Sequence, residues 1–189
     1  MRTIAAVVVA LACLPAAARA QDPQPRLEAR ADSAAAWGGL LPGARAAGQG
    51  RLTVWGFEVY DASLWVAPDF RQAGFERHAF ALELSYLRAF SARDIAQRSV
   101  AEMRRSGGFD AAQALRWQAA LEAVLPDVRR GDRVTGVHRP GVGAAFLVNN
   151  RPVGEVADTE FARLFFGIWL GAQTSEPALR ARLLTGTPP

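Results

Sequence analysis

The segment from residue 48 to residue 66, which reads G-Q-G-R-L-T-V-W-G-F-E-V-Y-D-A-S-L-W-V, constrains the fold most. Its β-branched and aromatic residues fit a pleated, half-buried surface. They predict strands over residues 51–55 and 57–66, with Gly56 as a bulge or bend between them. Arg51 stands at the entry of the first strand. A basic group at the end of an apolar sheet is one way to hold an anionic head group, but an arginine there can equally snorkel over the sheet edge.

The rest of the chain alternates between strand and helix signals. Residues 78–88 alternate so that Phe80, Leu82, Leu84 and Tyr86 share one face of a strand. Further strands are expected at 132–138, 144–148 and 152–156, and helices after the capping residues Ser91, Asp110, Asp158 and Ser175. Strands joined by hairpins, with helices grouped between them, indicate an α+β fold: a large antiparallel β-sheet packed on one face by a layer of helices.

The first 20 residues have the organisation of a secretory signal peptide. Arg2 is followed by an apolar run over residues 4–14 and by the small-x-small sequence Ala18-Arg19-Ala20. The apolar run is too short to span a membrane. A lipoprotein anchored through Cys13 is disfavoured, because the aliphatic residue expected three places earlier is missing. We therefore expect cleavage near Ala20, a flexible leader over residues 21–37, a single domain over residues 38–189, and a periplasmic or secreted location.

Composition excludes several classes of chemistry. Cys13 is the only cysteine, so cleavage would leave no thiol nucleophile, cysteine metal site or disulfide. The two histidines, His78 and His138, are far apart, and His138 is expected at a surface strand end. All 22 basic residues are Arg, which excludes Schiff-base chemistry. Two of these arginines precede the cleavage site, which leaves 20 arginines against 18 acidic residues. The net charge of the cleaved chain is therefore weak and does not indicate a nucleic-acid partner. No metal or cofactor is expected.

Read together, several segments resemble the chalcone isomerase-like superfamily, and its secreted bacterial branch most. They are G-x-G-R, F-E-V-Y-D-A-S-L-W-V, A-L-E-L-S-Y, S-V-A-E-M-R-R-S-G, G-D-R-V and E-F-A-R-L-F-F-G-I-W-L-G, in that order within residues 38–185. The resemblance implies an antiparallel sheet covered on one side by helices, with a ligand cleft between the two layers.

The resemblance does not carry over the catalytic residues of the plant enzymes. Their strand Arg falls on Arg51, but their strand Thr falls on Tyr60. Their Tyr, Lys and Asn around the first helix of the pair fall near Ser91, Asp94 and Arg98. Ring closure of a phenolate needs donors aimed at developing negative charge, and an acid in place of a cation opposes it. No catalytic residue is therefore expected.

The superfamily also contains fatty-acid-binding members without catalytic activity, which keep the Arg. The expected function is therefore a binding domain for a fatty acid or similar amphiphilic carboxylate. Arg51 would pair with the carboxylate, Tyr60 would assist, and Trp55, Tyr86 and Trp169 would line the apolar part. Two alternatives remain: an isomerase or intramolecular lyase of unknown substrate, and a structural or partner-binding envelope protein. An empty apolar cleft would favour binding, and a cleft filled by aromatic side chains would favour a structural role.

Overall fold

The computed structural model describes residues 39–189, so the predicted signal peptide and leader lie outside the described residues. The strands form a six-stranded antiparallel sheet in which each strand pairs with its neighbour in sequence, in the order β1 to β6. Their bounds are β1 Arg45–Val54, β2 Phe57–Val66, β3 Phe80–Tyr86, β4 Arg133–Arg139, β5 Gly143–Val148 and β6 Arg151–Val156. The α+β class and the antiparallel sheet predicted from the sequence are confirmed.

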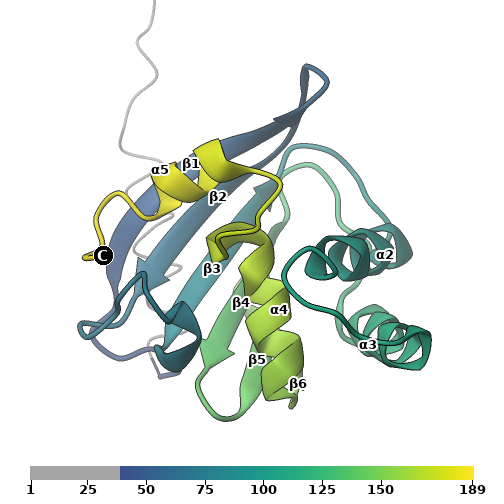
Figure 1. Cartoon of the computed structure of the whole chain (residues 1–189). Helices are drawn as coiled ribbons and strands as arrows, with labels where there is room; N and C mark the ends of the chain where they lie inside the picture. Colours follow the sequence, from purple (N-terminus) through teal and green to yellow (C-terminus); the bar gives the residue numbers. More distant parts are fainter. Residues whose placement is uncertain (1–38) are drawn as a thin grey trace, which may run out of the picture.

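The helices gather on one face of this sheet, called the inner face below (Figure 1). A 3₁₀ turn, η1 (Phe75–Arg77), precedes β3. The α-helices are α2 (Ala92–Met103), α3 (Ala111–Val124), α4 (Thr159–Leu170) and α5 (Pro177–Leu183). Helix α4 packs on β5 and α5 packs on β1, while α2 contacts α3 and α4. The α2–α3 pair therefore stands beside α4 and closes one side of the inner layer.

The main hydrophobic core fills the space between the inner face and the helices. Strand residues with the same alternation point into it, including Tyr60, Leu64, Leu82 and Tyr86. The intervening residues point to the opposite, outer face, where a smaller cluster forms around Trp65. Successive side chains of a strand alternate between the two faces of the sheet, so residues two apart lie on the same face.

Three of the four helix starts were read correctly from the sequence; the fourth was wrong, because the N-cap of α5 is Glu176 rather than Ser175 and no side chain caps that helix. Ser91 and Asp94 form a reciprocal capping box at α2. Asp110 and Asp158 cap α3 and α4 through the backbone N–H groups three residues later. Side-chain oxygens at these positions satisfy N–H groups that have no partner within the helix. The capping box gives Ser91 and Asp94 a structural role at the start of α2.

Three further sequence expectations need correction. The first strand extends from Arg45 to Val54 and leaves Trp55 in the turn. On α3, the apolar spacing predicts that Leu115 is buried, but Leu115 is exposed; Trp117 is buried instead, and its indole N–H donates to Asp158, the cap of α4. His138 is buried, stacked on a phenylalanine of β3 with ring centroids 4.8 Å apart.

Candidate functional site

The five residues expected to contact a ligand lie in three separate places. Arg51 pairs directly with Asp61, whereas its neighbour in β1 pairs with Tyr60. Residues opposite each other in antiparallel strands share a face, so Arg51 lies on the outer face. Tyr60, Tyr86 and Trp169 belong to the core on the inner face. Trp55 lies at the tip of the β1–β2 hairpin. Ligand contact by all five stays a prediction, but one pocket cannot contain them in this arrangement.

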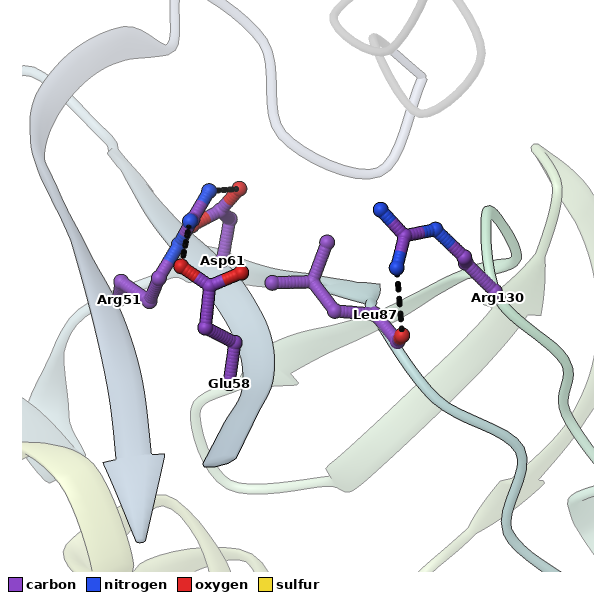
Figure 2. Close-up of polar contacts among 5 residues, drawn as sticks. All are labelled: Arg51, Glu58, Asp61, Leu87 and Arg130. Atoms are coloured by element: carbon purple, nitrogen blue, oxygen red, sulfur yellow. Dashed lines mark hydrogen bonds and ion pairs between the residues drawn. The ribbon is translucent and has the colours of Figure 1, made fainter. Parts of the chain in front are cut away.

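Arg51 is held by two carboxylates (Figure 2). Its Nε and Nη2 donate to the two carboxylate oxygens of Asp61, at 2.6 and 2.8 Å, and its Nη1 donates to Glu58. The hydrogen bonds that the guanidinium donates to these carboxylates, Asp61 first, raise its pKa above the usual value. Such a bidentate pair is geometrically specific and occupies the fork with which an arginine would grip a ligand carboxylate. The group of three side chains carries a net charge of −1.

The outer face carries a polar hollow that the sequence reasoning did not identify. It has a volume of about 340 Å³ and lies across β1 to β4. Arg51, Ser63, Glu83 and Arg133 are among its lining residues. The sequence pattern that could have revealed it is the alternation in β3, where Glu83 and Ser85 occupy the face opposite the apolar residues. Three arginines and two carboxylates line this hollow, so its charge is mixed.

A polar pair lies within the apolar inner layer, where β2 faces α4. The indole Nε1 of Trp169 donates to the Tyr60 hydroxyl at 2.9 Å. Tyr86 lies directly opposite Tyr60 on β3, and their rings meet edge to face with centroids 6.0 Å apart. Within residues 39–189, neither phenol donates its own proton to an acceptor. The Tyr60 hydroxyl already accepts a hydrogen bond and the Tyr86 hydroxyl is not fully enclosed, so both remain able to donate to a ligand that reaches the inner layer.

Both phenols are held in the neutral form. Burial is the main cause that raises the pKa of Tyr60; the hydrogen bond from Trp169 lowers it, and the charges of Glu176 and Glu102 raise it. Burial likewise raises the pKa of Tyr86. A neutral phenol remains a hydrogen-bond donor at physiological pH, and it is not available as a base.

Helix α2 presents polar residues close to these phenols. Ser99 is on its buried side, next to Val100. The preceding residue, Arg98, donates to Glu102 one turn further along the helix at 2.7 Å, and Glu102 is largely shielded from solvent. The charges of both residues influence Tyr60. This end of α2 therefore brings a cation and an anion to the margin of the Tyr60–Tyr86 pair.

The described part of the chain contains no cluster of His, Cys, Asp or Glu fit to hold a metal ion. Nor does any helix within residues 39–189 have the length and apolar character needed to cross a bilayer.

Comparison with known proteins shows which family has this architecture. The model of the chalcone isomerase-like family matches residues 46–185. The chain belongs to the chalcone isomerase-like family. Among solved structures, a fatty-acid binding protein of Arabidopsis thaliana shares the fold, with a TM-score of 0.59. The two sequences are 14% identical, and the similarity covers 76% of this chain and 88% of that one. No curated protein sequence matches the chain.

Family membership confirms the resemblance deduced from the sequence. The family match lies within residues 38–189, the range expected for the domain. In this member of the chalcone isomerase-like family, the inner layer between sheet and helices carries the phenol pair, while the arginine of the G-x-G-R segment faces the other way. The inner layer is therefore the candidate site, with Tyr60, Tyr86 and Trp169 as its polar and aromatic centre.

Proposed function

We propose that this protein is a non-catalytic chalcone isomerase-like domain that binds a fatty acid or similar amphiphilic carboxylate between its sheet and its helices. The observation that carries the proposal is the pair of buried phenols, Tyr60 and Tyr86, whose hydroxyl protons have no acceptor among the described residues. A carboxylate has two acceptor oxygens and no donor, so it can accept from both. The surrounding apolar layer suits an alkyl chain.

Electrostatics supports binding over catalysis. An isomerase or intramolecular lyase would need a group that takes up a proton near neutral pH. Burial holds Tyr60 and Tyr86 protonated, as their raised pKa values indicate. Both can hold an anion by hydrogen bonding, but neither can abstract a proton. Similarity of fold to a fatty-acid binding protein of Arabidopsis thaliana agrees with this proposal.

The head group decides the affinity in this arrangement. Burying about ten methylenes contributes roughly 8 kcal/mol. The loss of translational and rotational entropy on association, together with the ordering of the ligand, opposes this burial by about 4–15 kcal/mol. A hydrogen bond to a charged group adds about 1.5–3 kcal/mol. We assign this contact to Tyr60 and Tyr86, because Arg51 is engaged by Asp61 on the other face.

Entry of an alkyl chain requires movement of α2. Val100 and Met103 of α2 are buried against the same core as Phe161 and Phe165 of α4, so side chains now fill the layer. Because α2 packs on α3 and α4, a shift of the α2–α3 pair would open space above the two phenols and leave the sheet intact.

Native mass spectrometry of gently purified protein, followed by calorimetry with a long-chain fatty acid and the matching alcohol, tests the proposal. The fatty acid is expected to bind more tightly than the alcohol, because only the charged carboxylate can accept a hydrogen bond from each of the two phenols. Absence of any bound lipid, together with no heat of binding, would refute the proposal. That result would favour a structural envelope protein, consistent with the aromatic filling of the inner layer.

The proposed location is the periplasm or the exterior, after removal of residues 1–20. The basic residue, apolar run and Ala18-Arg19-Ala20 order support it. N-terminal sequencing of exported protein should begin at Gln21. A lipid-modified Cys13 as the first residue would contradict it.

A further inference from the structure

The tip of the β1–β2 hairpin is an exposed aromatic turn. Val54 pairs with Phe57, which leaves Trp55 and Gly56 as a two-residue connection with φ of 49° and 81°. Positive φ at both positions is the arrangement of a type I′ hairpin turn, in which Asn-Gly and similar small pairs are preferred. Trp55 is 93% exposed and Phe57 60% exposed. The hairpin extends beyond the rest of the sheet (Figure 1).

This turn runs against both local preference and burial. A bulky residue at positive φ is uncommon, because its side chain crowds the backbone. Here the unfavourable conformation brings no core packing in return, since almost the whole indole of Trp55 faces solvent. A position that violates local preference without a packing gain points to a binding role.

Cations without acidic partners lie beside the tip. The guanidinium of Arg88 lies over the Phe57 ring, 5.0 Å from its centroid. Arg130 donates to the carbonyl of Leu87 at 3.5 Å, and Leu87 in turn bonds β2 (Figure 2). Within residues 39–189, no carboxylate forms an ion pair with Arg88 or Arg130. The charge of Arg51, by contrast, is exceeded by its two carboxylates, which leave that group at −1, so the cations available near the tip are Arg88 and Arg130.

We propose that this tip docks the protein on an anionic lipid surface. Trp is enriched at the membrane–water interface, because its ring is amphipathic. Basic side chains near the surface add attraction to anionic head groups. A convex aromatic tip flanked by unpaired arginines combines both properties. Arg88 and Arg130 supply the charge complementarity that selects an anionic bilayer over a neutral one.

The tip also lies at the end of the sheet that carries the candidate site. Tyr60 is three residues from Phe57 along β2, about 10 Å at strand spacing. Tyr86 is two residues from Arg88. Docking through the tip would therefore hold the inner layer next to the membrane. The docking itself does not depend on a bound fatty acid, so it is tested separately from the proposed function.

Vesicle sedimentation of the full chain tests the proposal. The vesicles contain phosphatidylcholine alone or mixed with phosphatidylglycerol. Wild type should bind the anionic vesicles more tightly. The double variant Trp55→Ser/Phe57→Ser should bind them about tenfold more weakly or worse. Arg88→Gln/Arg130→Gln should lose about thirtyfold, or about fivefold for each arginine. Leu115→Ser, which removes a 67% exposed side chain from α3, is the matched control and should leave binding unchanged.

A local measurement separates the tip from the rest of the chain. Acyl chains brominated near the head group should quench the tryptophan fluorescence of wild type, and the quenching should fall in Trp55→Phe. Equal binding by the tip variant and the Leu115→Ser control would overturn the proposal. So would indifference to phosphatidylglycerol, unchanged quenching in Trp55→Phe, or no vesicle binding by wild type. Residues 1–38 are common to every variant, so differences between variants report on the substituted positions.

Discussion

Removing one hydroxyl group from the inner layer separates its structural role from its binding role. In Tyr60→Phe, the indole N–H of Trp169 loses its acceptor at 2.9 Å while remaining buried. A buried donor left without a partner costs about 1–3 kcal/mol. Tyr86→Phe removes a hydroxyl to which no described residue donates and leaves no buried donor without a partner, so its effect on unfolding should be within about 0.5 kcal/mol. The two variants thus form a matched pair on facing strands.

Urea denaturation measures the difference. With a slope of about 2 kcal/mol/M, the midpoint of Tyr60→Phe should fall by about 0.5–1.5 M, whereas that of Tyr86→Phe should hardly change. Calorimetry should show a different pattern: both variants lose about tenfold to a hundredfold in affinity for a fatty acid, because each removes one donor to the carboxylate. Unchanged affinity in both variants would refute the assignment of the head group to the phenols. Equal midpoints would refute the importance of the Trp169 bond.

Three further predictions address stability. Asp158→Ala removes both the α4 cap and the acceptor of the Trp117 indole, so we expect a loss of about 2–4 kcal/mol in urea denaturation, against about 1 kcal/mol for removing the α3 cap alone. Gly48→Ala would place a Cβ 2.1 Å from an α5 carbonyl and should speed hydrogen exchange of α5, whereas Gly108→Ala, which has open space, should not. Burial lowers the pKa of His138 in the folded protein. The contribution of the neutral imidazole to the free energy of unfolding is therefore complete above about pH 6.5, the pKa in the unfolded chain, and is lost as the pH falls. In His138→Phe, the free energy of unfolding should fall less between pH 7 and 5 than in the wild type.

The sequence predicted the fold well where the signals were local. Ser91, Asp110 and Asp158 marked helix starts because an N-cap needs only its own next three residues. The β5–β6 turn, between the strands expected at 144–148 and 152–156, is formed by Asn149 and Asn150, and asparagine tolerates the positive φ found at both positions. The order of these elements, with hairpins between most strands, was enough to indicate an antiparallel sheet.

The site was harder to predict, because it depends on strand parity. A shift of one residue moves a side chain to the other face, and no local signal shows whether Arg51 shares a face with Tyr60. Pairing with β2 decides it: Arg51 meets Asp61 across the strands. The inward position of β1 is instead Gly50, where the Leu179 side chain of α5 packs so closely that a Cβ would lie 2.7 Å from it. Only the tertiary contact reveals that requirement for glycine.

The contact between α5 and β1 has a consequence for the order of folding. Pairing each strand with its neighbour in sequence makes most sheet contacts short in chain length, so hairpins can form as the chain is made. The junction of β1 with the segment after α5 is different: Arg45 donates to the carbonyl of Gly186, 141 residues later, and the Gly186 N–H donates to Ala47. Until that segment leaves the ribosome, the Arg45–Ala47 end of β1 is an open strand edge, able to pair with another chain. The interval between synthesis of β1 and arrival of α5 is therefore a period in which this edge of a nascent chain is open to association with another chain.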